Sequence, residues 1–200
     1  LQDKSKKFFE TKLKNNSLKK ESGLAEIYMS DIHADREFQT LPVTQFQGRS
    51  KAFIKVQTGC DESCSFCTVV RARGSSVSDT RENILDNVRH SINGGYKEIT
   101  LTGINLGTWG MDFHAKETFS SLVEDIANLN GNFRVRLSSI NPMEIDDHLI
   151  ELVAQHEKIC PHLHIPLQSG DTEILSKMKN TIFRNIEILH LFCIETSGIF

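Results

Sequence analysis

The chain contains four short runs in which every second residue is apolar, a period that predicts β-strands at 52–56, 99–101, 135–137 and 163–167. Between and after them, apolar residues recur at intervals of three and four, which predicts helices at 84–92, 119–126, 145–153 and 171–178. The segment Asp79-Thr80-Arg81-Glu82 precedes the first helix as a capping box. Strands that alternate with helices in this order predict βα units and a parallel sheet.

The residues on the opposite face of these predicted strands are polar or charged. They are Lys55, Gln57, Thr100, Thr102, Arg134, Arg136, Ser138, His162, His164 and Gln168. A flat parallel sheet that helices cover on both faces is apolar throughout, so we expect a curved sheet whose concave face lines a ligand cavity. The predicted fold class is α/β, a partial (β/α) TIM-type barrel with about four βα units. An amphipathic antiparallel sheet is the alternative, but the long helical crossovers argue against it.

Composition and charge narrow the class of protein without naming a partner. With 200 residues, 38% of them hydrophobic and 24% charged, the chain is long enough for one core. The net charge of -3 gives no overall attraction to nucleic acid, so contact with RNA would need a local patch. The lysine-rich segment 1–23 predicts a solvated amphipathic helix, with an RNA-binding arm as the alternative. No apolar run suits a membrane span or a secretory signal, so we expect a cytoplasmic protein.

Three cysteines, Cys60, Cys64 and Cys67, form a CxxxCxxC loop directly after the first predicted strand. Three thiolates can bind three irons of a 4Fe-4S cluster and leave the fourth iron open, whereas structural zinc usually has four ligands. The open iron can bind S-adenosylmethionine, and electron transfer into the sulfonium then cleaves a carbon–sulfur bond to give a reactive radical. Zinc stays as the alternative, with His162 or His164 as a fourth ligand from a distant strand.

Other side chains with possible chemistry have two interpretations each. Phe66 either stacks on an adenine ring or is a core aromatic. Four arginines either meet a carboxylate or phosphate or neutralise buried acids, and they are Arg71, Arg73, Arg134 and Arg136. The isolated Cys160 and Cys193 are expected to pack as small buried hydrophobic residues and not to bind metal.

Several long sequence segments resemble one enzyme family. They are 53–67 (FIKVQTGCDESCSFC), 72–74 (ARG), 97–103 (KEITLTG), 134–140 (RVRLSSI) and 159–170 (ICPHLHIPLQSG). Over about 47–178 the chain resembles the methylthiotransferases of the radical S-adenosylmethionine (radical SAM) superfamily. Within them it is similar to the bacterial enzymes that methylthiolate N6-threonylcarbamoyladenosine in tRNA. The resemblance implies a partial barrel of the radical SAM type with the cluster and S-adenosylmethionine in its lumen.

The resemblance also implies a role for each matching residue. Cys60, Cys64 and Cys67 would bind one 4Fe-4S cluster, while no residue is assigned to catalysis. The residues expected to bind S-adenosylmethionine are Phe66, Thr102, Gly103, Asn105, Ser138, Ser139 and Gln168. Phe66 would lie near the adenine, and the loop 102–105 would contact the amino acid part of the cofactor. The polar face contains Ser138 and Gln168 independently, whereas Ser139 falls on the apolar face and is assigned from the resemblance alone.

The domain organisation and the reaction are further implications of the resemblance. Residues 1–46 would be the C-terminal remnant of an N-terminal methylthiotransferase domain with a linker, and 47–200 an incomplete radical SAM core with an atypical tail after about 179. A complete family member would bind a second 4Fe-4S cluster, the anticodon stem-loop of tRNA and an electron donor such as a flavodoxin or ferredoxin. The implied function is methylthiolation of N6-threonylcarbamoyladenosine next to the anticodon. The alternatives are isopentenyladenosine in tRNA or a ribosomal protein as substrate, or a truncated cluster-binding product without full activity.

Overall fold

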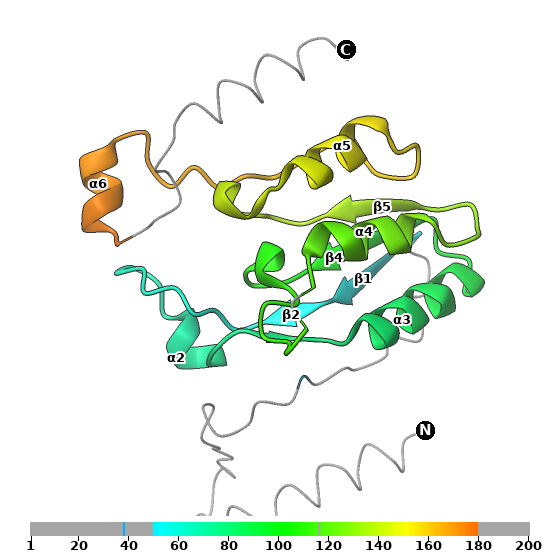
Figure 1. Cartoon of the computed structure of the whole chain (residues 1–200), viewed down its shortest axis with the longest axis horizontal. Coiled ribbons are helices and arrows are strands. Elements are labelled where there is room, and N and C mark those ends of the chain that lie inside the picture. Colours follow the sequence, from blue (N-terminus) through cyan, green and yellow to red (C-terminus); the bar gives the residue numbers. More distant parts are fainter. Residues whose placement is uncertain (1–37, 39–49, 116, 180–200) are drawn as a thin grey trace, which may run out of the picture. The chain divides into compact units, whose positions relative to one another are not determined.

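A three-stranded parallel sheet forms the centre of the structure, a computed structural model that describes residues 38, 50–115 and 117–179 (Figure 1). Its strand order is β1-β4-β5, with β1 at Lys51–Lys55, β4 at Glu98–Thr102 and β5 at Arg134–Leu137. The described residues all belong to one compact unit, 36–200. The predicted α/β class with a parallel sheet is confirmed. The predicted domain boundary at 46/47 and the atypical tail after 179 lie outside the described residues.

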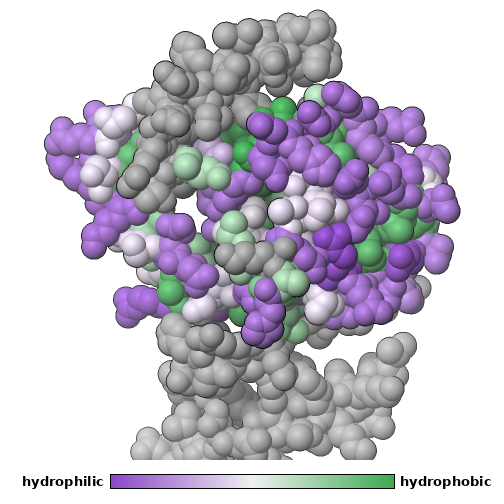
Figure 2. Space-filling model, viewed as in Figure 1, coloured by the Kyte–Doolittle hydropathy of each residue, from purple (hydrophilic) through white to green (hydrophobic). Residues whose placement is uncertain are grey.

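Two helices connect the strands and pack on the sheet, α3 (Arg81–Asn93) and α4 (Phe119–Ala127). After β5, α5 (Asp147–Gln155) packs against α4, and the short α6 (Thr172–Lys177) follows. In Figure 1, α3 and α4 lie side by side, and α3 contacts β1 while α4 contacts β5. Their outward side chains are mostly hydrophilic, as Figure 2 shows. None of the helices within 50–115 and 117–179 is long and apolar enough to cross a membrane.

The helices begin at the capping residues in the sequence. Thr80 Oγ1 accepts a hydrogen bond from the Asn83 N–H at the start of α3, so the cap lies one residue later than in the predicted box, which began at Asp79. The Asn83 side chain in turn donates to Asp79 at 3.1 Å, so residue 83 and not Glu82 completes the cap. Asp146 caps α5 by accepting from the Leu149 N–H at 2.7 Å. These caps fix where each connection leaves the sheet.

The two faces of the sheet differ as the alternation predicts. Ile99, Leu101 and Val135 point toward the helices and are fully buried. The other face carries Glu98, which is buried beneath three cations, Lys51, Arg134 and Arg136. Arg134 and Arg136 therefore neutralise a buried acid, which is the second of their two interpretations. Burial opposes ionisation of Glu98, but hydrogen bonds from Lys51, Arg136 and Arg134 lower its pKa to about 2.

The fourth predicted strand does not form, and that part of the prediction is wrong. Residues 159–164 make isolated parallel bridges, Val135 with Ile159 and Ser139 with His164. Pro161 and Pro166 interrupt the segment and have no N–H to donate to a strand ladder. The described sheet therefore has three parallel strands where four βα units were expected.

The sequence pattern also missed a short strand pair next to the cysteine loop. β2 (Gln57–Thr58) continues the direction of the chain after β1 and pairs antiparallel with β3 (Val77–Ser78). Between them lie the cysteine loop and the five-residue helix α2 (Val69–Arg73). Two-residue strands are too short to show an alternation in the sequence. Their pairing closes the cysteine loop at its base.

Candidate cluster and cofactor site

The cysteine loop is anchored where it leaves and rejoins the strand pair. Gly59 has a φ of +73°, and a Cβ at this position would lie 1.9 Å from the Ser75 carbonyl oxygen. Only glycine fits there, because the backbone of the returning chain occupies the space of a side chain. The Cys60 N–H donates to the Gly74 carbonyl at 3.2 Å. The first cysteine is therefore fixed by the backbone on both sides of the loop.

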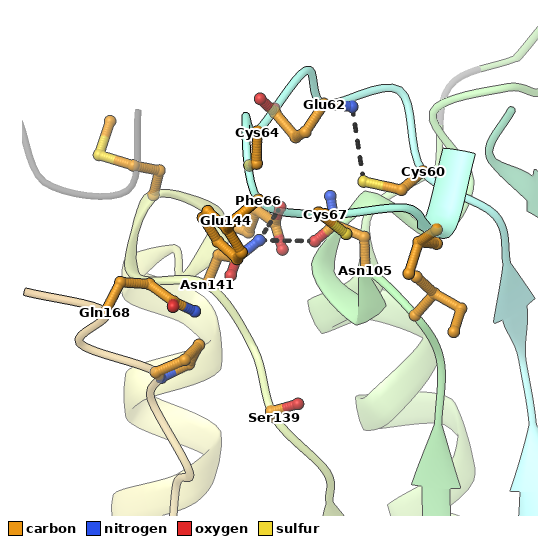
Figure 3. A pocket seen from close by; sticks show the side chains of 14 residues that line it. Cys60, Glu62, Cys64, Phe66, Cys67, Asn105, Ser139, Asn141, Glu144 and Gln168 are labelled. Atoms are coloured by element: carbon orange, nitrogen blue, oxygen red, sulfur yellow. Dashed lines mark hydrogen bonds between the residues drawn. The ribbon is translucent and has the colours of Figure 1, made fainter. Parts of the chain in front are cut away.

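A cavity of about 280 Å³ opens beside this loop, at the carboxyl ends of the parallel strands (Figure 3). In a parallel α/β structure these ends are where loops from different strands meet, so ligand sites form there. All three cysteines of the motif line the cavity. The other lining residues are Glu62, Phe66, Val69, Ile104, Asn105, Ser139, Asn141, Met143, Glu144, Pro166 and Gln168.

Two of the three thiols at this cavity, those of Cys60 and Cys64, have a raised pKa. Burial raises the pKa of the Cys60 thiol, and the Glu62 N–H, which donates to Cys60 Sγ at 3.4 Å, opposes part of this effect. Burial likewise raises the pKa of Cys64, and the carboxylate of Glu62 adds to the shift. Metal binding to these thiols would release protons, so we expect the affinity for a metal to rise with pH.

Three thiols at one cavity can serve either of the two predicted metal sites, an iron–sulfur cluster or a zinc ion with a fourth ligand. Zinc binds sulfur at about 2.3 Å and needs its ligands to converge on one point. In the described ranges, no group of three or more His, Cys, Asp or Glu side chains is gathered closely enough to hold a metal ion. The thiols instead surround a shared cavity, and neither His162 nor His164 lines it to supply a fourth ligand. The two predicted histidine ligands therefore lie away from the thiols, and the carboxylates at the cavity are those of Glu62 and Glu144.

The predicted cofactor-binding residues divide into two groups. Four of them line the cavity with the cysteines, and these are Phe66, Asn105, Ser139 and Gln168. Phe66 is 52% exposed, so it is not a core aromatic residue in this structure. Their roles toward S-adenosylmethionine stay predictions.

Three predicted residues, Thr102, Gly103 and Ser138, lie outside the cavity lining. Thr102 Oγ1 donates to the Ile54 carbonyl at 3.2 Å, so its hydroxyl is used within the sheet. The Ser138 hydroxyl is buried and has no hydrogen-bond partner among the described residues. Regular alternation ends with β5 at Leu137, and the chain beyond it presents Ser139 instead of Ser138 to the cavity. The role of Ser138 toward the cofactor stays a prediction.

A polar network on the cavity wall escaped the sequence analysis. Asn141 Nδ2 donates to Asn105 Oδ1 at 2.7 Å and to Glu144 Oε1 at 3.1 Å (Figure 3). Burial raises the pKa of Glu144, although the neighbouring amides of Asn141 and Asn105 oppose this. After β5, Asn141 is the N-cap of the 3₁₀ turn η2 (Pro142–Glu144), and Glu144 is the last residue of that turn. Their position just after the end of a strand could have indicated a place at the site, because the loops after parallel strands converge there.

The chain matches the family model described as the radical SAM superfamily over residues 54–193. The threonylcarbamoyladenosine tRNA methylthiotransferase MtaB of Rickettsia prowazekii is 41% identical over 155 residues, which are 77% of this chain and 37% of that protein. A tRNA-2-methylthio-N(6)-dimethylallyladenosine synthase of Clostridium botulinum (strain Loch Maree) is 37% identical over 164 residues, 82% of this chain and 36% of that protein. An MtaB of Thermotoga maritima is 37% identical over 134 residues, 66% of this chain and 30% of that protein.

These comparisons confirm the resemblance to radical SAM methylthiotransferases that the motifs indicated. The chain spans about a third of the length of the three relatives. The family match covers most of the chain, including the cysteine loop and every residue that lines the cavity. This protein belongs to the radical SAM superfamily.

Proposed function

We propose that this chain forms the cluster-binding and S-adenosylmethionine-binding core of a tRNA methylthiotransferase. The observation that carries the proposal is that Cys60, Cys64 and Cys67 line one cavity together with aromatic and amide side chains. The relatives are named for methylthiolation of tRNA adenosines, which agrees with this site. A tRNA substrate would place the protein in the cytoplasm.

Different residues of the cavity would bind the cluster and S-adenosylmethionine. The three thiolates would hold three irons, leaving one iron facing the cavity. A bound, reduced cluster supplies the electron that cleaves S-adenosylmethionine into methionine and a carbon radical. Asn105, Ser139 and Gln168 offer donors and acceptors for the amino acid part of the cofactor, and the exposed ring of Phe66 offers a face for the adenine.

For the substrate, we propose N6-threonylcarbamoyladenosine next to the anticodon of tRNA. Relatives from two organisms carry this substrate in their names. N6-dimethylallyladenosine in tRNA is the second candidate, because the Clostridium botulinum relatives are named for it. We further propose that the sheet and the segment 159–170 form part of a TIM-type barrel around the cavity, and that a flavodoxin or ferredoxin donates the electron.

Reconstitution with iron and sulfide under anaerobic conditions tests the cluster site. We expect the chain to bind about four irons and four sulfides per molecule, with a broad absorption near the visible region that dithionite bleaches. Cys64→Ala should abolish cluster binding, while Cys160→Ala, a buried cysteine away from the cavity, should retain it. Equal cluster content in both variants, or stoichiometric zinc in the purified protein, would overturn the cluster assignment.

The substrate is tested in a strain that lacks the gene. Mass spectrometry of digested tRNA should show unmodified N6-threonylcarbamoyladenosine where the parent strain has its methylthio form. Loss of the methylthio group from dimethylallyladenosine instead would identify the second substrate. Retention of both methylthio nucleosides would contradict a role in tRNA methylthiolation.

A further inference from the structure

We propose that Gln57 is a positioning residue that holds the cysteine loop and the loop after β4 at a fixed separation. The inference rests on the proposed function, because it assigns the cluster to one of these loops and cofactor contacts to the other. Gln57 does not line the cavity itself. It lies in β2, the strand that leads into the cysteine loop, and its side chain contacts the loop that carries Asn105.

The side chain of Gln57 is fully buried, and each of its polar atoms has partners. Nε2 donates to the Gly59 carbonyl at 2.9 Å, to the Thr58 carbonyl at 3.0 Å and to Ser76 Oγ at 2.8 Å. These three acceptors lie at the base of the cysteine loop. The amide nitrogen therefore binds both the outgoing and the returning chain of that loop.

The amide oxygen of Gln57 contacts the other loop. Oε1 accepts hydrogen bonds from the N–H groups of Ile104 and Asn105, both at 2.9 Å. Both residues line the cavity. A single planar amide thus joins the two loops on either side of the cavity, and its burial makes each lost bond costly.

The glycine of the second loop allows this close approach. A Cβ on Gly103 would lie 3.0 Å from Gln57 Oε1 and 3.3 Å from Gln57 Cβ. Any side chain at 103 would push against the amide or the loop. This contact gives Gly103 a structural role, although Gly103 does not line the cavity.

The position of Asn105 extends the effect of Gln57 across the cavity. Asn105 Oδ1 accepts from Asn141, which also donates to Glu144. The backbone of Asn105, held by Gln57, therefore sets where this polar wall stands relative to the cysteines. A shift of either loop would change the distance between the open iron and the groups that bind the amino acid part of the cofactor.

Two variants distinguish the hydrogen bonds of the Gln57 amide nitrogen from those of its amide oxygen. Gln57→Glu keeps an acceptor for Ile104 and Asn105 but removes the donors to the cysteine loop. Gln57→Met has similar length and offers neither. The control is Arg81→Met, because Arg81 bonds with Glu117, Asp125 and Ser121 between α3 and α4 and does not line the cavity.

The first measurement is amide hydrogen exchange in the chain without a cluster. We expect the Ile104 and Asn105 amides to exchange at least about tenfold faster in Gln57→Met than in the wild type, and to stay protected in Gln57→Glu. Arg81→Met should leave both amides protected. Unchanged protection of both amides in Gln57→Met would overturn the positioning role, whether or not the chain binds a cluster.

The second measurement is the affinity of the reconstituted chain for S-adenosylmethionine. We expect both Gln57 variants to bind it at least about tenfold more weakly per cluster than Arg81→Met does. Gly103→Ala, which crowds the same amide, should weaken binding in the same direction and serves if the Gln57 variants do not fold. Equal affinity in all variants would overturn the inference, whereas a wild-type chain that binds no cluster would instead overturn the proposed function.

Discussion

The backbone N–H of Ser65, between the second and third cysteines of the motif, donates a 2.9 Å hydrogen bond to the carbonyl oxygen of Met178. Met178 is the C-cap of α6, and the Ser65 hydroxyl also reaches the carbonyl of Lys177. The cysteine loop is therefore hydrogen-bonded to the end of a helix that lies more than a hundred residues later in the chain. The mobility of that loop depends on the integrity of α6.

This contact predicts that the cap of α6 affects cluster retention. Asp171 accepts hydrogen bonds from the N–H groups of Glu173 and Ile174, at 2.7 and 3.1 Å. Asp171→Ala should destabilise α6 by about 1 kcal/mol, and a six-residue helix has little other support. We expect the variant to lose its cluster to a chelator several-fold faster than the wild type. Asp171→Asn, which can still cap, should behave like the wild type, and equal loss in both variants would contradict the link.

The buried carboxylate of Glu98 predicts a loss of stability in acid. Its pKa of about 2 in the folded chain lies below the ordinary value of 4.5, so the unfolded chain binds more protons between these values. The stabilisation is complete above pH 4.5 and is lost as the pH falls toward 2. Because one pKa unit corresponds to about 1.4 kcal/mol, we expect the free energy of unfolding to fall by about 3 kcal/mol over this range. Urea titrations should show a smaller fall in Glu98→Gln.

The raised pKa of Glu144 predicts the opposite pH dependence of the free energy of unfolding. Burial raises its pKa, so the folded chain binds more protons than the unfolded chain. Its contribution is fully present below the ordinary pKa and is lost as the pH rises through the raised value. We expect Glu144→Gln to remove this decline and to be at least as stable as the wild type at pH 7. Lower stability of Glu144→Gln at pH 7, measured by urea unfolding, would show that the ionised carboxylate is stabilising.

The close contact between Gly107 and Glu144 predicts that a side chain at position 107 destabilises the chain. A Cβ at this position would lie 2.4 Å from Glu144 Cβ and 2.6 Å from Glu144 Oε2. Gly107→Ala should therefore destabilise the chain by about 1–3 kcal/mol, because Glu144 or the turn has to move. Gly170→Ala is the control, since a Cβ there meets nothing within 4 Å, and its effect should stay within about 0.5 kcal/mol. Similar effects of both changes on urea unfolding would contradict the steric account.

The sequence predicted those parts of the fold in which one period governs many residues. β1 and β5 alternate between buried and more exposed residues, and in β4 polar and apolar residues alternate although the first four are all buried. The same alternation at 163–167 failed, since Pro161 and Pro166 remove the N–H groups that a ladder needs. Periodicity describes side-chain direction but not backbone hydrogen bonding.

The site was predictable where it depends on chemistry and less so where it depends on loop geometry. The spacing of Cys60, Cys64 and Cys67 was sufficient to place them together in one loop. Ser139, which the alternation placed on the apolar face, lines the cavity, and Asn141 and Glu144 went unnoticed, because all three lie beyond the regular strand. Gln57 was assigned to the polar face, yet its function in the structure is a set of backbone contacts that no residue pattern reveals.

The central claim is that the three cysteines hold a cluster whose open iron binds S-adenosylmethionine. The direct measurement is the electron paramagnetic resonance spectrum of the reduced, reconstituted chain, recorded with and without S-adenosylmethionine. We predict a 4Fe-4S signal whose g values change when the cofactor is added, because a ligand at the open iron alters its electronic structure. A chain that gives no cluster signal, or a signal that S-adenosylmethionine leaves unchanged, would contradict the account.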